Sequence, residues 1–475
     1  MSGRSERLTP NLVFVGSFVA LCAFWLLWWA ALYPGVLSPD SIDQWEQARS
    51  FQFNSWHPYL YALILSGLGR LWNSPSTMGL LQVFVTALLI SWIGRYALVS
   101  GVRIRWVLLC VAVYALHPQF GVYNSTIWKD VLFSTLLVAE AFLLYQVAAQ
   151  RVEAWQPYVL LGVLAGVSVS LRVNGIINLV LPAALLLFSA VRRRWIVFMI
   201  VSALLGQVFF GVLLSRAVHV VPARFQMDQI RVKTVGAIYR LSRPAPSLSS
   251  EEAAVFESMM SRDLWYSAYS PSYSNELFFQ HFLKLPEVQD LTVENLNQSG
   301  FYAEWKRAVV GAAIRNPGAI VRDKYLQFLY FAISRDVPLM NVNSVEIYGP
   351  KLREQAYPYL SAVLPSPRIP RLRAWCIQVI DVSSGGLILG QLLWAPGWGV
   401  IAYLAMLVYA ALKKYTATVL YISFVLLNVV FVIVISPASD YRFLYFATLA
   451  LFVTPLLLAA EAQGIDRQVS ARSSQ

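Results

Sequence analysis

Long apolar runs recur along the whole chain, and short polar stretches separate them. A helix of about 20 apolar residues crosses a hydrocarbon core about 30 Å thick. Candidate spans lie near residues 11–32, 77–98, 104–122, 127–148, 156–171, 175–191, 195–214, 374–394, 398–412, 416–436 and 442–460. The pattern therefore predicts an all-α, polytopic integral membrane protein with about 10–12 transmembrane helices.

Two parts of the chain depart from this pattern. Residues 58–72 form an apolar segment of marginal length, which predicts a helix lying on the membrane surface. Residues 215–372 mix polar and aromatic residues, and their length predicts a small folded unit of mainly helical and irregular structure. Within it, residues 316–334 are apolar enough to interact with the membrane, although the charged run at 322–324 argues against a simple span. The pattern leaves open whether this segment crosses.

The distribution of positive charge predicts which side each part faces. Basic loops at 100–105, 150–156 and 191–195 favour the cytoplasm, as do Arg4 and Arg7 before an uncleaved first span. The intervening loops then lie outside. We therefore expect three parts: an N-terminal transmembrane domain (1–214) with a first outer loop (33–57), an extracytoplasmic insertion (215–372), and C-terminal transmembrane helices with a short cytoplasmic tail (373–475).

The composition excludes an ordinary soluble globule. The chain is 58% hydrophobic and 13% charged, whereas soluble domains carry about 25% charged residues. The net charge of +12 is explained by cytoplasmic loops and by attraction to anionic membrane lipids, without a nucleic-acid partner. Cys22, Cys110 and Cys376 all lie in apolar runs, which favours small core residues over disulfides or metal ligands.

Four polar clusters fall at the predicted outer ends of apolar helices, where charges are costly unless they face water, a partner or a substrate. The clusters are SPDSIDQW with the following WHP, STIWKDVLF, LRVNG and SPASDYRF. Asp40 and Asp43 are three residues apart and share one face of a helix. They could bind a divalent cation, or one could act as a general base. Equally, Asp40 could cap the helix, and the negative charge of Asp43 could interact favourably with the helix dipole.

The other clusters supply basic groups. Lys129, Arg172 and Arg442 could contact a donor phosphate, and His57 and Asn174 are further candidates for binding the donor. Interfacial ion pairs or a snorkelling lysine would explain the same residues structurally. Together the clusters suit an anionic, lipid-linked substrate handled outside the cytoplasm. The chain lacks GxxxxGKS, HExxH and GxSxG, which argues against P-loop, zinc-protease and serine-hydrolase chemistry.

The stretches YPGVLSPDSIDQWEQA, WHPYLYALIL, WKDVLF and SPASDYRFLYF resemble bacterial membrane proteins of the GT-C glycosyltransferase superfamily. The likeness covers most of the membrane part and is weak over 217–372. It implies a GT-C-like fold in the bacterial inner membrane, with the active site on the periplasmic face. It also implies a polyprenyl-phosphate-linked sugar donor and a cell-envelope glycan, lipid or protein as acceptor.

The resemblance also implies roles for individual acids. Asp40 matches the catalytic base, and Asp40, Asp43 and Asp130 would hold a divalent cation such as Mg²⁺ or Mn²⁺. This chain has D-S-I-D where a strict D-x-D would be expected, which puts the role of Asp43 and the metal in doubt. Direct displacement by an acceptor hydroxyl would invert the anomeric centre of the sugar.

The aromatic residues Trp265, Tyr266 and Tyr269 suggest an acceptor surface on which a sugar could stack, or simply packing within the insertion. A transporter or flippase for polyprenyl lipids is the competing class, and it would bury its polar groups near mid-membrane. An enzyme resembling O-antigen ligases is a lesser alternative. Its outer loop should carry catalytic Arg and His residues, for which Arg224, His219 and His281 are available.

Overall fold

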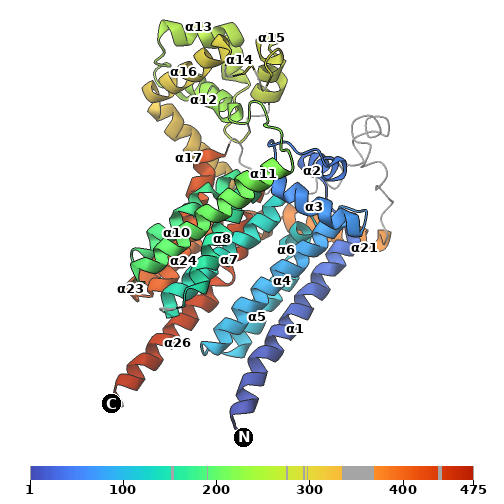
Figure 1. Cartoon of the computed structure of the whole chain (residues 1–475), viewed down its shortest axis with the longest axis vertical. Helices are drawn as coiled ribbons and strands as arrows, with labels where there is room; N and C mark the ends of the chain where they lie inside the picture. Colours follow the sequence, from blue (N-terminus) through green and yellow to red (C-terminus); the bar gives the residue numbers. More distant parts are fainter. Residues whose placement is uncertain are drawn as a thin grey trace.

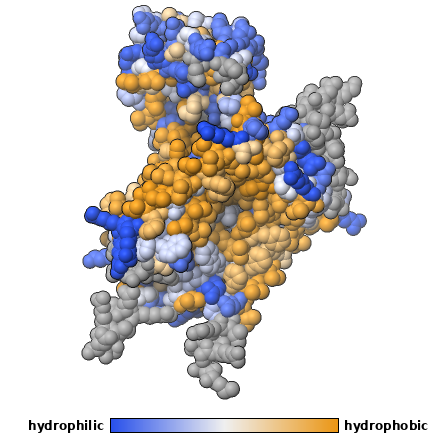
Figure 2. All heavy atoms as spheres, in the orientation of Figure 1, coloured by the Kyte–Doolittle hydropathy of each residue, from blue (hydrophilic) through white to orange (hydrophobic). Residues whose placement is uncertain are grey.

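The computed structural model describes residues 2–150, 154–189, 191–273, 276–292, 295–296, 298–333, 369–436 and 441–473. Within these ranges the chain is helical and contains no strand, only two isolated β-bridges. Long helices form a bundle, a smaller helical head stands on one end of it, and both chain termini lie at the other end (Figure 1). A broad apolar band covers the bundle, whereas the head surface is mixed and largely polar (Figure 2). The predicted all-α, multi-pass membrane architecture is confirmed.

Six helical stretches in the described ranges are long and apolar enough to cross a membrane: Pro10–Ala31, Ser76–Val99, Lys129–Ala149, Arg193–Ala217, Thr416–Ile435 and Arg442–Ile465. They correspond to α1 (Ser2–Ala31), α4 (Ser76–Val99), α7 (Lys129–Gln150), α10 (Arg193–Gln207) continuing through η2 (Val208–Leu213) and α11 (Leu214–Ala217), α24 (Thr416–Ile435), and η5 (Tyr441–Leu444) with α25 (Tyr445–Leu451) and α26 (Thr454–Ser473). The count rises to eight if each of two bent helix pairs is one span.

The bent pairs and the shorter helices account for the difference from the expected 10–12 spans. The helices α5 (Ile104–Leu116) and α6 (Pro118–Asn124) meet at 60°, and α21 (Pro370–Gly385) meets α22 (Leu387–Trp394) at 112°. Three other predicted spans are shorter apolar helices: α8 (Gln156–Leu171), η1 (Val173–Leu179) with α9 (Leu181–Leu186), and α23 (Gly397–Leu412). At 1.5 Å per residue, a 16-residue helix such as α8 reaches about 24 Å, less than the hydrocarbon core.

Close backbone packing holds α8 against α10. Gly162 and Gly166 are four residues apart on α8, and a side chain at either would collide with the backbone near Met199 or Ala203 of α10. This spacing of small residues lets the two helices approach closely. Such close packing matters in a membrane, because the hydrophobic effect does not drive helices together in lipid.

The head has a hydrophobic core of its own, separate from that of the bundle. Its helices are α12 (Asp228–Leu241), α13 (Ser250–Met259), α14 (Arg262–Ser267), η3 (Glu276–His281), η4 (Phe282–Lys284), α15 (Pro286–Gln289), α16 (Gly300–Arg315) and the start of α17 (Pro317–Ile333). Stacked aromatic rings, among them Trp265 and Trp305, fill this core. The buried Asp228 carboxylate accepts hydrogen bonds from Tyr302 and Trp305, so the polar group at its centre is satisfied.

The helix α17 joins the head to the bundle. It packs against α12 in the head and against α23 and α24 in the bundle. Gln327 of α17 is fully buried and donates a hydrogen bond of 2.9 Å to the backbone oxygen of Ser436, where α24 ends. The ambiguous segment 316–334 is therefore, over its described residues, a connecting helix, and it is absent from the stretches apolar enough to span.

Two β-bridges fasten the loops around the helices α2 (Pro39–Ser50) and α3 (Tyr59–Leu71). Val36 pairs with Thr126 and ties the loop before α2 to the loop before α7. Asn54 pairs with Val221 and ties the loop between α2 and α3 to the chain entering the head. The segment predicted at 58–72 is thus helical, and its 13 residues are too few to span.

Candidate functional site

The first acidic motif forms a short, strongly capped helix at the head end of the bundle (Figure 1). Ser38 caps α2: its hydroxyl accepts from the backbone N–H of Ser41, and the Ser41 hydroxyl accepts from the backbone N–H of Ser38. Pro39 occupies the first turn, where its missing N–H costs nothing. The indole of Trp128 donates a further hydrogen bond of 2.7 Å to the Ser38 hydroxyl. This contact fixes the start of α2 beside the start of α7.

Gly35 allows this close approach. Its φ of +120° disfavours other residues, and a Cβ there would lie 2.8 Å from the side chain of Ile127. The backbone N–H of Val36 donates to Ser125, and that of Ile127 donates back to Val36, both at 3.0 Å. The YPG motif therefore brings the two loops together.

The charged groups of three motifs meet around the Asp40 carboxylate. Arg442 donates to its Oδ2 at 2.9 Å, and the Lys129 Nζ lies 3.8 Å from the same oxygen. The His57 Nε2 lies 3.9 Å from the Asp40 Oδ1 and 3.7 Å from the Asp43 Oδ2. We call these five residues the Asp40 cluster. They come from α2, the loop before α3, the start of α7 and η5, so three of the four polar motifs meet here.

Electrostatics differ sharply between the two acids. Burial alone would raise the pKa of Asp40, but the charges of Arg442 and Lys129 hold it well below its usual range. For Asp43 burial raises the pKa, and the neighbouring Asp40 adds to this, although a hydrogen bond of 2.6 Å from Gln47 opposes it. Pairs of acids whose environments push their pKa values apart are typical of acid–base sites.

His57 is a neutral member of the cluster. Burial, with Lys129 and Arg442 nearby, lowers its pKa to about 3 despite the opposing effect of Asp40. The Lys129 ammonium lies 3.1 Å from the Nδ1 atom and can only donate there. The proton of the neutral ring therefore sits on Nε2, facing both carboxylates.

Aromatic rings hold the arginine in place. The Arg442 guanidinium lies 5.0 Å from the centre of the Trp128 ring and 5.3 Å from that of Phe443. Arg172 lies on Phe443 as well, at 4.2 Å. The sequence alone did not indicate Trp128, Phe443 or Gln47. These residues contact the charged groups through tertiary packing, which no regular spacing in the sequence predicts.

Arg172 is not short of an anion, which corrects the reasoning that assigned it to a donor phosphate. It forms a buried ion pair with Asp130 across α7 and the end of α8. The two residues are 42 positions apart in the sequence, so neither motif alone predicts this ion pair. Asn174 lies in η1, half-buried, and within the described residues no hydrogen bond joins it to the Asp40 cluster. Asp440 lies outside the described residues.

The predicted metal set does not fit. Asp130 is engaged by Arg172, and Asp40 already faces two cationic side chains, which would repel a divalent ion. Across the described ranges, no three His, Cys, Asp or Glu side chains are grouped so that they could hold a metal ion. We therefore derive no step through a metal.

The predicted acceptor residues belong mainly to the head core. Trp265 is fully buried, stacks on Tyr239 and Trp305, and donates to the backbone of Phe256. Tyr269 is buried and donates to Asp323 at 2.6 Å. These two residues therefore pack the head core, which corrects their prediction as an acceptor surface. Tyr266 is 45% exposed, with the Arg240 guanidinium 4.0 Å above its ring.

The head reaches the Asp40 cluster through Trp56. This residue precedes His57 and stacks on Phe278 of the head core, with ring centres 6.1 Å apart. Arg224, a candidate for ligase-like chemistry, instead contacts the backbone oxygen of Leu291 within the head. The head thus supports the cluster, and Arg224 is not drawn into it.

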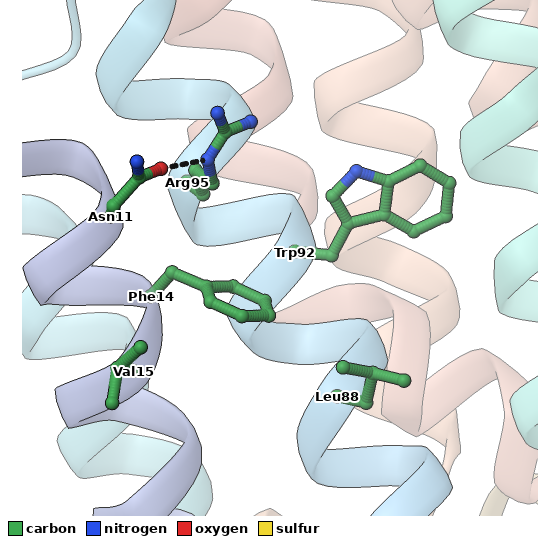
Figure 3. A pocket seen from close by; sticks show the side chains of 6 residues that line it. All are labelled: Asn11, Phe14, Val15, Leu88, Trp92 and Arg95. Atoms are coloured by element: carbon green, nitrogen blue, oxygen red, sulfur yellow. Dashed lines mark hydrogen bonds between the residues drawn. The ribbon is translucent and has the colours of Figure 1, made fainter. Parts of the chain in front are cut away.

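A cavity of about 530 Å³ lies elsewhere, between α1 and α4 (Figure 3). Phe14, Val15, Leu88 and Trp92 line it, and Arg95 donates to Asn11 at 2.9 Å at one end. It lies toward the terminal end of these helices, away from the Asp40 cluster. The two sites are therefore distinct.

Comparison of the chain with protein-family models, with curated proteins and with solved structures returned no match. The functional argument therefore rests on the geometry of the Asp40 cluster.

Proposed function

We propose that this protein is a membrane glycosyltransferase that moves a sugar from a polyprenyl-phosphate donor to an extracytoplasmic cell-envelope acceptor. The observation that carries the proposal is the Asp40 cluster. It combines one strongly acidic carboxylate, two cationic side chains and a neutral histidine at the head end of an apolar bundle. The GT-C-like motifs that suggested this function are the same segments that build the cluster.

The cations suit the donor phosphate. Arg442 offers a planar fork for phosphate oxygens, and Lys129 adds a mobile point charge. In the present arrangement the Asp40 carboxylate neutralises both groups. A donor phosphate of the same charge sign would compete for them, and its apolar tail would remain against the bundle surface.

Asp40 then acts as the general base. Once the phosphate draws Arg442 and Lys129 away, the groups that hold the pKa of Asp40 low are engaged elsewhere, and the carboxylate becomes a better proton acceptor. It takes the proton of an acceptor hydroxyl while the hydroxyl oxygen attacks the anomeric carbon. The bond from that carbon to the phosphate oxygen breaks, and polyprenyl phosphate leaves with its charge stabilised by Arg442 and Lys129.

Turnover of defined donors tests the proposal. Purified protein in lipid vesicles would be incubated with a panel of radiolabelled polyprenyl-phosphate sugars and with cell-envelope extract as acceptor. We expect label to move from the lipid to the acceptor for one donor class, with release of polyprenyl phosphate. If the protein moved intact lipid-linked sugar across the vesicle membrane without breaking the sugar–phosphate bond, it would be a flippase instead.

A further inference from the structure

A second polar group lies deep in the bundle, and the chemistry of the Asp40 cluster does not use it. Glu140 is ten residues after Asp130 on α7, so it sits about 15 Å further along the helix axis. Its side chain is completely buried near the middle of the span. A carboxyl at this depth is costly and marks a functional site by default.

The carboxyl of Glu140 is poorly satisfied. Neither oxygen has a hydrogen bond of normal geometry. Its polar neighbour is Ser168 of α8, but the Ser168 hydroxyl donates to the backbone oxygen of Ala165 at 2.8 Å. Asn178 of η1 approaches the same hydroxyl with its nitrogen at 3.4 Å, and its own side-chain oxygen is also without a partner. Side chains from α7, α8 and η1 therefore gather here, with unpartnered oxygen atoms on Glu140 and Asn178.

Within the part of the chain that the structure describes, no ion pair neutralises this carboxyl. The neighbouring elements α8, η1, α9, α24 and α25 contain no Asp, Glu, Lys, Arg or His. Of the other elements packed near α7, α4 carries Arg95, bonded to Asn11, and η5 carries Arg442, bonded to Asp40. Glu461 of α26 accepts from the start of α24. A carboxylate left ionised here would have no compensating charge.

The backbone is interrupted shortly after Ser168, three residues further along α8. The helix α8 ends at Leu171, and a 3₁₀ segment, η1, carries Asn178 back into the bundle. Broken helices beside a buried acid are how many membrane proteins hold Na⁺ or H⁺, because side-chain and freed backbone oxygens together replace the water around the ion.

We propose that Glu140, Ser168 and Asn178 form a binding site for a small cation, a sodium ion or an exchangeable proton, within the membrane bundle. Either cation would neutralise the carboxyl: sodium would be coordinated by the surrounding oxygen atoms, and a carboxyl proton would donate a hydrogen bond to one of them. The site is independent of the Asp40 cluster and stands whether or not the protein transfers sugars.

Two measurements on the purified full-length protein separate the ions. The first is thermal unfolding in NaCl and in choline chloride at equal concentration. An ion that binds the folded state raises Tm, and the rise grows with the concentration of that ion. Bound sodium predicts a higher Tm in NaCl for the wild type and no difference for Glu140→Gln. The second is the infrared carbonyl band of a protonated carboxyl. If Glu140 carries an exchangeable proton, this band should shift in the folded wild type after transfer to D₂O. It should be absent in Glu140→Gln.

The control is Asn428→Ala, because Asn428 is equally buried but, among the described residues, its side chain donates within its own helix to the backbone oxygen of Phe424. Should Glu140→Gln fail to fold, Asn178→Ala must weaken the sodium effect or alter the frequency of the carboxyl band. A wild-type protein with no sodium effect and no solvent-exchangeable Glu140 carboxyl overturns the proposal.

Discussion

Asp40 is the residue on which the Asp40 cluster is built, since three side chains converge on its two oxygens. Asp40→Asn keeps the shape and removes the proton acceptor. We expect sugar transfer to fall by about 100-fold or more, the range for loss of a general base. Glu46→Gln is the matched control, because it removes one acid from the same helix outside the cluster. If Asp40→Asn turned over the donor as fast as Glu46→Gln and the wild type, Asp40 would not be the general base.

His57 makes a prediction about pH and stability. Its pKa is lowered to about 3 in the folded protein, against an ordinary value of 6.5. As the pH falls, the histidine of the unfolded chain binds a proton at a higher pH than that of the folded protein. The contribution of His57 to the free energy of unfolding is therefore fully present above about pH 6.5, and it is lost as the pH drops toward the pKa of the folded protein. We expect Tm of the wild type to fall more steeply below pH 6.5 than that of His57→Asn. Parallel curves would contradict a buried neutral histidine.

Sequence reasoning at the residue scale succeeded where charge is rare. In an apolar chain a charged residue needs a reason, so Asp40, His57, Lys129 and Arg442 could be singled out, and the structure brings them together. It failed for Trp265 and Tyr269, because aromatic residues serve a buried core and a sugar-binding surface equally well.

At the scale of elements, the ion pair of Asp130 and Arg172 joins α7 to the end of α8, and Arg172 also supports Phe443 beside Arg442. Removing one partner leaves a buried charge unpaired, which typically costs about 3–5 kcal/mol. We expect Asp130→Asn and Arg172→Gln each to lower the free energy of unfolding strongly, and the double variant to lose less than their sum. Chemical denaturation in detergent measures this cycle. Additive losses would mean that the two residues stabilise the bundle separately.

The boundaries of elements followed from the sequence less well than their existence. Apolar runs located the long spans, but the bend between α5 and α6 and the short 3₁₀ segment after α8 depend on tertiary packing. Likewise Gln327 of α17 meets Ser436 across 109 residues, a contact that no local pattern encodes.

At the scale of the whole molecule, the head and α2 occupy one end of the bundle and the termini the other (Figure 1). Basic residues precede α5 and α10 at the terminal end, and the positive-inside tendency predicts that this end faces the cytoplasm. Single cysteines at the exposed positions Gln52 and Glu251 should therefore react with an impermeant thiol reagent outside intact spheroplasts. Cysteines at the exposed Arg103 and Arg193 should react only after permeabilisation.

The three native cysteines are buried and would first be replaced by serine or alanine. Labelling of the head-side positions only from the cytoplasm would reverse the orientation of the whole molecule. It would also remove the extracytoplasmic acceptor from the proposed function.

The central claim is that the Asp40 cluster receives a lipid phosphate, and the structure of the protein with polyprenyl phosphate in nanodiscs tests it most directly. This product lacks the sugar, so it can bind without reacting. We predict phosphate density between Lys129 and Arg442, with Arg442 released from Asp40 and the lipid tail against the apolar surface of the bundle. Phosphate bound away from these two residues, with the Arg442–Asp40 contact intact at saturating lipid, would contradict the account.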